Sequence, residues 1–229
     1  MRALVASRRD TISAALLNLR TGALSEYRPG LRFQTASIVK VDILETLLYE
    51  AEQRHRALTA TEQDEATEMI EESDNDDATA LWDDDGGAPA IASYDRSIGM
   101  VATSPDTAGY WGETLTTAAD QIRLLSELLN SSSPLDAAAR AYQLGLMRNV
   151  IPFDRWGVSD GPSAGVSVAL KNGWVPIVDD NWEINSIGYV TGAGRRYLLA
   201  ILTDHNPTEG YGIATVDAVS RLVWGALSI

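Results

Sequence analysis

The chain has 229 residues, of which 45% are hydrophobic and 22% are charged, and this composition suits one large globular domain or two lobes that share a core. Its formal charge of −14 argues against nucleic acid as a partner, because a phosphate backbone would be repelled and the sequence contains no basic patch. The lack of cysteine excludes disulfides, thiolate nucleophiles and cysteine metal sites.

No segment of the sequence has the apolar length that a membrane span requires. The first ten residues, MRALVASRRD, lack the apolar stretch of a signal peptide, and no later run approaches roughly 18 apolar residues. We therefore expect no membrane span. The compartment stays open, since the protein is secreted if a signal peptide has been removed and cytoplasmic otherwise, and the oligomeric state is equally undecided.

The predicted elements begin with two strands and continue with helices. Residues 11–19 and 23–30, joined by a turn-like Arg-Thr-Gly, are typical of a β-hairpin. The run 37–56 contains neither Pro nor Gly and carries an apolar stripe, which predicts a largely buried helix that begins at Ser37. Three further helices are predicted at 58–70, 116–129 and 133–147, with Thr59, Thr117 and Ser133 as their N-caps.

The last third of the sequence is predicted to return to strands. Residues 166–174, 183–190 and 195–203 are rich in apolar and β-branched residues, and the last two runs are joined by the turn Thr-Gly-Ala-Gly. An amphipathic run at 211–227 predicts a closing helix. The sequence has no internal repeat and no long linker, so we expect a single domain over residues 1–229.

Three short polar motifs follow one another along the chain, two at predicted helix starts and one on a predicted strand. They are Ser37-x-x-Lys40, Ser73-Asp74-Asn75 and Lys171-Asn172-Gly173. Each has an ordinary structural alternative, since either serine could be only a helix N-cap and Lys-Asn-Gly could be only a turn. A specified tripeptide arises by chance about once in several thousand positions, so the order of all three favours a functional interpretation.

Lysine occurs only inside these motifs. The chain has 18 basic residues, and Lys40 and Lys171 are its only lysines. Arginine stays protonated in proteins, whereas a lysine amine can lose its proton when it is desolvated or placed beside another cation, and it can then act as a base. Because Lys40 follows Ser37 by one helical turn, the two share a helix face and Lys40 can reach the hydroxyl. Coding bias against lysine is the alternative explanation.

In this order the motifs resemble the motif set of class A β-lactamases and penicillin-binding proteins. The resemblance extends over nearly the whole chain and looks greatest for the actinobacterial serine hydrolase branch, in which ASIVKVDIL, SDND, KNGW and AILTDHNP recur. It implies an α/β (α+β) fold of the β-lactamase/transpeptidase type. An antiparallel sheet flanked by helices, about 1–36 and 160–229, would lie beside an all-helical lobe, about 37–159, with the active site between them.

The resemblance also implies catalytic roles for four residues. Ser37 would be the nucleophile, and Lys40 would accept its proton. Ser73 would relay the proton to the leaving group. Lys171 would supply positive charge for a substrate carboxylate and for Ser73.

Four further residues are implied to bind the substrate. Asn75 would bind its amide side chain while contacting the lysine of the first motif. Asn172 and Gly173 belong to the strand along which the substrate lies. The backbone N–H groups of Trp174 and Ser37 would form an oxyanion hole, whose loss typically costs about 10²–10³ in rate.

Two acidic residues are candidates for the base that clears the acyl-enzyme, a task that class A β-lactamases give to a loop glutamate. The stretch 104–120 is shorter than the family pattern, and Glu113 falls too close to Thr116 to match that glutamate. Asp106 is the other carboxylate in reach. Because either could be an ordinary solvated loop charge, we expect slow release of β-lactams.

Two further departures from the family pattern concern recognition of the substrate. Asn172 replaces the usual Thr or Ser, and Glu183 and Asn185 stand on the strand where an arginine commonly helps to bind the substrate carboxylate. Anionic substrates should therefore bind less tightly. The interval from Ser37 to Ser73 is also shorter than in typical class A enzymes, which predicts a wider site.

Other polar residues carry weaker signals. His55 and His205 fall outside the motifs, which disfavours a Ser-His-Asp triad. The acidic run at 83–87 lacks the ligand order of an EF-hand, so a solvated helix end is favoured over a calcium site.

The sequence thus predicts a serine hydrolase that acts through an acyl-enzyme on an amide, peptide or β-lactam carbonyl of a small-molecule or peptide substrate, without metal or cofactor. Two alternatives stay open. One is a DD-peptidase-like or biosynthetic acyl-transfer enzyme that β-lactams acylate and that releases them slowly. The other is a non-catalytic binding protein on the same fold, which the nearly complete set of serine and lysine motifs disfavours and the short loop favours.

Overall fold

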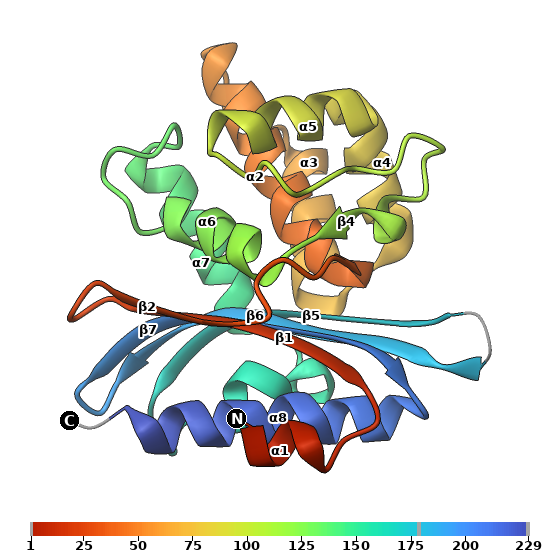
Figure 1. The fold of residues 1–229 in the computed structure, drawn as a ribbon. Coiled ribbons are helices and arrows are strands. Elements are labelled where there is room, and N and C mark those ends of the chain that lie inside the picture. The colour runs from red at the N-terminus through yellow and green to blue at the C-terminus, as the bar shows by residue number, and fades with distance from the viewer. Residues whose placement is uncertain (1, 178–179, 228–229) are drawn as a thin grey trace.

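In the computed structural model, which describes residues 2–177 and 180–227, a central sheet separates two groups of helices (Figure 1). The sheet has five strands in the order β2-β1-β7-β6-β5, and every neighbouring pair is antiparallel. Its strands are β1 (Thr11–Asn18), β2 (Ala23–Tyr27), β5 (Ser167–Pro176), β6 (Trp182–Gly192) and β7 (Arg195–Asn206). The strand that carries the Lys-Asn-Gly motif, β5, is therefore an edge strand.

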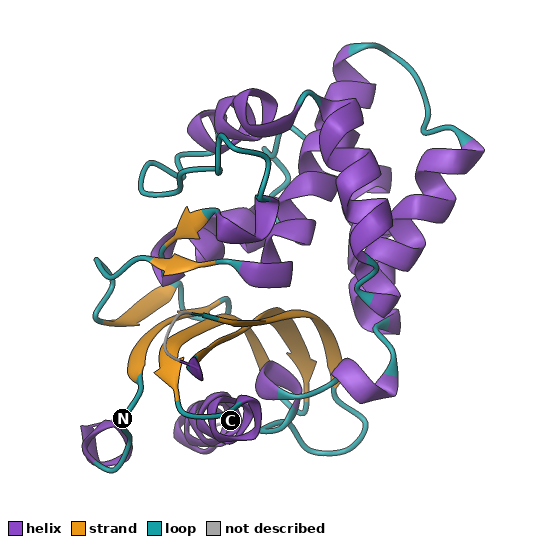
Figure 2. Cartoon of the chain, turned by 90° about the vertical axis from the view of Figure 1, so that its right-hand side faces the viewer, coloured by secondary structure: helices purple, strands orange, loops and turns teal. Residues whose placement is uncertain are grey.

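Helices cover both faces of the sheet. Helices α1 and α8 lie on one side of it, and α2 to α7 gather on the other (Figures 1 and 2). Among the described helices, none combines the length and the apolar character needed to cross a membrane. The helices are α1 (Arg2–Ala6), α2 (Val39–Gln53), α3 (Ala60–Thr67), α4 (Asn75–Asp85), α5 (Gly87–Ser97), α6 (Ala118–Glu127), α7 (Ala137–Asn149) and α8 (Glu209–Ala226).

Short elements connect these parts, and one of them, η1, carries Ser37. Two very short strands, β3 and β4, pair antiparallel, with Phe33 opposite Thr116. The short elements are β3 (Phe33–Gln34), β4 (Leu115–Thr116), the 3₁₀ turns η1 (Ala36–Ile38), η3 (Trp111–Glu113), η4 (Pro152–Asp154) and η5 (Gly157–Ser159), and the π turn η2 (Glu68–Glu72).

The hydrophobic core has two parts, one on each face of the sheet. Because strand side chains alternate between faces, a strand that is covered on both faces reads as a continuous apolar run, as β7 does. Alternate residues of β7 belong to different parts of the core. Leu198, Ala200 and Leu202 pack with the helices of the α2–α7 side, and Tyr197, Leu199 and Ile201 pack on the α8 side.

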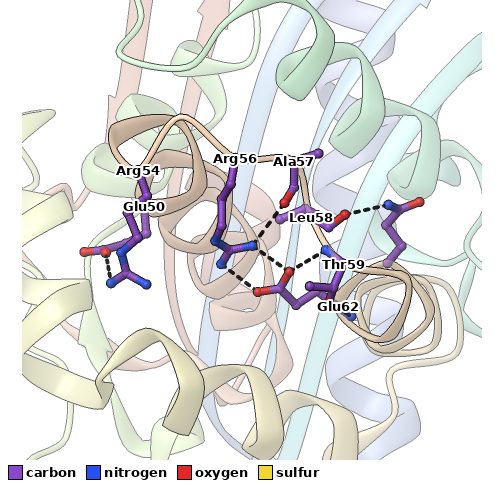
Figure 3. A network of polar contacts seen from close by, with 8 residues as sticks. Glu50, Arg54, Arg56, Ala57, Leu58, Thr59 and Glu62 are labelled. Atoms are coloured by element: carbon purple, nitrogen blue, oxygen red, sulfur yellow. Dashed lines mark hydrogen bonds and ion pairs between the residues drawn. The ribbon is translucent and has the colours of Figure 1, made fainter.

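The predicted fold is confirmed, since an antiparallel sheet is flanked by helices as the β-lactamase/transpeptidase type requires. The expected N-cap at Thr59 is also confirmed. The Glu62 amide donates to its hydroxyl at 3.1 Å, and the Thr59 amide donates to the Glu62 carboxylate at 2.7 Å. Figure 3 shows this capping box, whose carboxylate also binds the Arg56 guanidinium and so ties the end of α2 to the start of α3.

Two local predictions are wrong. The helix α7 is capped by Asp136, whose carboxylate accepts from the backbone N–H of Ala139 at 2.8 Å, and not by Ser133, whose hydroxyl accepts from the amide of Leu135. A carboxylate is the stronger acceptor at the positive end of a helix.

The acidic run at 83–87 is also not simply a solvated helix end. Asp85 is only 7% exposed, and burial raises the pKa of its carboxyl to about 8, whereas Asp83 and Asp84 are exposed. The described residues include no group of three or more His, Asp or Glu side chains that could hold a metal ion.

Candidate active site

Ser37 lies in a single 3₁₀ turn that leads directly into α2. The chain just before it is fixed from two directions. The Thr35 amide donates to the Thr114 carbonyl at 2.8 Å, and the Asn185 side-chain amide donates to the carbonyls of Gln34 and Thr35 at 2.8 and 3.2 Å. As a result, Ser37 is partly exposed and lines a cavity of about 660 Å³.

The buried amine of Lys40 joins the first motif to the second. It donates to the Ser73 carbonyl at 2.6 Å, to the Asn75 side-chain oxygen at 2.8 Å and to the Ser73 hydroxyl at 3.3 Å. Burial, followed by the positive charge of Lys171, lowers the pKa of Lys40 to about 7, while Asp74, Asp154 and Asp77 act in the opposite direction. An amine with this pKa is partly neutral at neutral pH and can accept a proton.

The backbone at Ser73 is in the left-handed region, with a φ of 62°. Few residues other than glycine adopt this conformation, and it is often kept at functional sites. The N-cap of α4 is the next residue, Asp74, whose carboxylate accepts from the amides of Asp76 and Asp77 at 2.8 and 3.0 Å. Ser73 is therefore not the helix cap, and its hydroxyl is left to Lys40.

The edge strand β5 lies against the turn that holds Ser37. A Cβ atom added to Gly173 would lie 2.7 Å from the Thr35 carbonyl oxygen and 2.8 Å from the Ser37 amide nitrogen. Only glycine fits this approach without a shift of one backbone or the other. Gly173 thus brings the backbone of β5, and Trp174 with it, next to the Ser37 amide.

The third motif contributes a second buried amine, that of Lys171. Burial lowers the pKa of Lys171 to about 8, and the charge of Asp154 acts in the opposite direction. The amine of Lys171 makes no hydrogen bond to the part of the chain that the structure describes. The charge of Lys171 also helps to lower the pKa of Lys40.

The motifs in the sequence do not include Asp154, whose charge raises the pKa values of both lysines. This residue ends η4 and is only 3% exposed. Burial raises the pKa of the Asp154 carboxyl, whereas the charges of Lys171 and Lys40 lower it. A carboxylate near two buried lysines is favourable, but no local pattern in the sequence marks Asp154 as that residue.

The side chain of Asn172 does not lie with the lysines. Strand alternation turns it to the opposite face of β5 from Lys171, and it is buried. Its amide donates to the carbonyls of Asp154 and Trp156 at 2.7 and 3.1 Å. The position of Asn172 therefore does not support the expected substrate contact. Its hydrogen bonds instead fix the turn that carries Asp154.

The cavity beside Ser37 brings together several expected residues and adds others. Asn75, Glu113 and Trp174 line it, and the ring of Trp174 meets that of Trp156 edge to face at 6.0 Å. The remaining described lining includes Gln34, Thr79, Tyr110, Trp111, Val175 and Ile177. Trp111 stands out among them, because its ring centroid lies 5.0 Å from the Lys40 amine and covers that amine on one side.

The two acidic residues considered for deacylation have different positions. Glu113 is exposed and lines the cavity. Asp106 is absent from the described lining, and its carboxylate accepts from the amides of Ala108 and Tyr110 at 2.8 and 2.9 Å, which fixes the loop between them. His205 lies beside Asp204 at 2.9 Å, and neither it nor His55 belongs to the described lining.

The fold is that of the class A β-lactamase-like family. It places a serine at a helix start, a buried lysine one turn later and a second serine in contact with that lysine, which is the motif arrangement of that family. The chain belongs to the beta-lactamase enzyme family, whose model matches residues 54–227. That match begins after the first motif.

A curated relative covers the first motif as well. The Mycobacterium tuberculosis protein named "Putative lipoprotein LppW" is 31% identical over an alignment of 221 positions that covers 93% of this chain and 69% of that protein.

Solved structures share the fold. A β-lactamase from Chitinophaga pinensis has a TM-score of 0.88 at 16% identity and covers 98% of this chain and 97% of its own. PBP-A has a TM-score of 0.86 at 21% identity, with 98% and 93% covered. A class A β-lactamase from Mycobacterium abscessus has a TM-score of 0.84 at 22% identity, with 98% and 96% covered. At these identities, the likeness establishes the fold.

Proposed function

We propose that this protein is a serine hydrolase that forms an acyl-enzyme on Ser37 with an amide, peptide or β-lactam carbonyl. The observation that carries this proposal is the amine of Lys40, which has a pKa of about 7 and donates to the hydroxyl of Ser73. A buried amine of this pKa suits a general base at neutral pH. A protein that only binds a ligand has no need of it.

The proposed reaction has two steps. In the first, the hydroxyl oxygen of Ser37 attacks the carbonyl carbon, and its proton passes to the neutral amine of Lys40. The bond to the leaving group then breaks, and Ser73 passes a proton from Lys40 to that group. In the second step, water attacks the ester, the acid is released and Ser37 recovers its proton. The backbone amides beside Gly173 would bind the developing oxyanion.

Slow release of the acyl group is the second part of the proposal. Asp106 is engaged by the amides of its own loop, and Glu113 is an exposed carboxylate at the cavity wall. Neither arrangement resembles a buried base that holds a water molecule against the ester. A DD-peptidase-like or acyl-transfer enzyme, in which another acceptor takes the acyl group, is therefore the alternative that this observation favours.

Labelling with a fluorophosphonate tests the proposal. The probe should modify wild-type protein at one residue, and peptide mapping should locate the adduct on Ser37. The Ser37→Ala variant should stay unlabelled, whereas Ser220→Ala, which alters a buried serine of α8, serves as a control that should be labelled like the wild type if it folds. Labelling that persists in Ser37→Ala would exclude Ser37 as the nucleophile.

A further inference from the structure

The ring of Trp111 lies between the amine of Lys40 and the cavity beside Ser37. The centroid of the ring is 5.0 Å from the amine nitrogen, and Trp111 belongs to the described lining of the cavity. Lys40 is fully buried and is absent from that lining. Water in the cavity therefore meets the indole before it can reach the amine.

A hydrogen bond fixes the orientation of the indole. Its Nε1–H donates to the hydroxyl of Thr79 at 3.1 Å, and that hydroxyl donates at 2.9 Å to the carbonyl of Asn75, one turn earlier in α4. The side chain of Asn75 in turn accepts from the amine of Lys40 at 2.8 Å. The first turn of α4 thus holds both the amine and the ring that covers it.

The turn that carries Trp111, η3, is also tied to the chain beside Ser37. The Thr35 hydroxyl donates to the Gly112 carbonyl at 3.3 Å, and the Thr35 amide donates to the Thr114 carbonyl at 2.8 Å. On one side η3 is therefore fixed to the segment of the nucleophile, and on the other side it is fixed to α4 through the indole.

Contact with an aromatic face has two effects on a lysine amine. It keeps water away, which favours the neutral form, and the negative face of the ring attracts the ammonium, which favours the charged form. Hydration stabilises an ammonium more than an aromatic face does, so an indole in place of water favours the neutral amine. In agreement, burial is the largest cause of the low pKa of Lys40.

We propose that Trp111 is a positioning residue for the general base. Its indole excludes water from the amine of Lys40, so the amine is neutral and can accept the proton of Ser37. In that step the O–H bond of the serine breaks and an N–H bond forms on the lysine, and the new ammonium faces the ring instead of solvent. This inference rests on the proposed acyl-enzyme function. Trp111 acts through Lys40 and is not itself placed on the reacting atoms.

The charged groups that act on Lys40 stay in place when Trp111 is changed. The charge of Lys171 on β5 lowers the pKa of Lys40, and three carboxylates raise it. These carboxylates are Asp74 and Asp77 at the start of α4 and Asp154 in η4. Glu113, in the same turn as Trp111, is exposed. A substitution of Trp111 therefore changes the hydration of the amine and leaves the charges around it unaltered.

The presence of only two lysines in the chain allows a direct test. Protein that carries ¹³C at Cε of lysine gives one resonance for each, so the titration of Lys40 is followed without any reaction at Ser37. In wild-type protein the Lys40 resonance should show nuclear Overhauser contacts to the ring protons of Trp111, which also assign it. In Trp111→Ala water reaches the amine, so the midpoint of this titration should rise by about one pH unit or more. The midpoint for phosphonylation of Ser37 should rise with it.

Two further variants complete the test. Trp224→Ala is the matched control, because Trp224 is also half-buried and its ring also covers a cation, the Arg195 guanidinium at 4.1 Å, but it lies in α8 on the other side of the sheet. This variant should leave the midpoint of Lys40 unchanged. Thr79→Val keeps the shape of an exposed side chain and removes the hydroxyl that holds the indole, so it should raise the midpoint by a smaller amount than Trp111→Ala.

The outcomes separate this inference from the function on which it rests. An unchanged or lower Lys40 midpoint in folded Trp111→Ala, or in Thr79→Val if Trp111→Ala does not fold, overturns the role of Trp111 and leaves Ser37 as the proposed nucleophile. A midpoint that rises as expected, in a protein whose Ser37 resists the fluorophosphonate, overturns the proposed function, and the role of Trp111 in positioning a base is then lost with it.

Discussion

The amine of Lys40 donates a hydrogen bond to the side-chain oxygen of Asn75 at 2.8 Å. A neutral amide at this distance orients the lysine without adding negative charge beside it. The low pKa of Lys40, about 7, therefore depends on its burial, on the charge of Lys171 and on the choice of an amide over a carboxylate at position 75.

The variant Asn75→Asp should consequently raise the pKa of Lys40. A carboxylate in contact with the amine favours its protonated form, so less neutral base is present at pH 7. The pH midpoint for phosphonylation of Ser37 should rise by about one unit or more, and the rate at pH 7 should fall about tenfold. Asn130→Asp makes the same change at an exposed position and should leave the midpoint in place. An unchanged midpoint in Asn75→Asp would show that Lys40 is not the titrating base.

Substitution of Gly173 should separate the two backbone segments that meet at Ser37. The added methyl group of Gly173→Ala would lie 2.8 Å from the Ser37 amide nitrogen, so β5 or the turn must move. We expect a loss of about 10²-fold or more in the acylation rate, as for the removal of one oxyanion donor. Gly145→Ala, in α7 with open space around it, is the matched control and should keep full activity and gain up to about 1 kcal/mol of stability. Equal activity of the two variants would argue against the oxyanion hole.

The helical side of the molecule should lose stability as the pH rises from 5 to 7. Burial raises the pKa of Asp85 to about 8 and of Asp95 to about 7, and it also raises those of Asp42 and Glu45. A carboxyl whose pKa is raised by folding stabilises the fold fully below its unfolded pKa, and this contribution is lost as the pH rises through the folded value.

Thermal unfolding at the two pH values measures this effect. We expect a lower Tm at pH 7 by roughly 3 °C or more, and a smaller difference in Asp85→Asn. The lowered pKa values of the lysines act mainly above pH 7, and Glu62, whose pKa is lowered to about 2, acts below pH 5, so neither masks the trend. A Tm that is constant or rises from pH 5 to pH 7 would contradict the prediction.

The lifetime of the acyl-enzyme should depend on Glu113 and not on Asp106. Only the first of these carboxylates lines the cavity, so only it can reach a water molecule at the ester. We expect Glu113→Gln to lengthen the life of an acetyl adduct about tenfold, as for the loss of a weak general base. Asp106→Asn should change that lifetime by about twofold at most if its loop is retained. If the acetyl adduct lasts longer in Asp106→Asn but not in Glu113→Gln, then Asp106 and not Glu113 is the base for deacylation.

The features that could be predicted from the sequence are those that depend on local patterns. The order of the motifs indicated the fold, and the spacing of Thr59 and Glu62 indicated a capping box that the structure contains. Strand alternation alone already implied that Asn172 points away from the face of Lys171, although the resemblance to a family assigned it to the substrate.

The features that escaped prediction depend on tertiary contacts. The relation of Asp154 to Lys171 arises where a turn after α7 passes the edge strand β5, and no local pattern marks such a meeting. Asn185 likewise looked like a substitute for an arginine, whereas its amide binds the chain just before Ser37. The burial of Asn185 depends on the segment before Ser37, which packs against β6, so the sequence of β6 alone does not predict it.

The most direct test of the central claim is an intact-protein mass time course with p-nitrophenyl acetate, a neutral activated ester, on wild-type protein and on Ser37→Ala. We expect a single acetyl adduct that forms faster as the pH passes 7, decays slowly and is missing from Ser37→Ala. An adduct that forms equally in both proteins, or that maps to another residue, would contradict the claim that Ser37 is a nucleophile activated by Lys40.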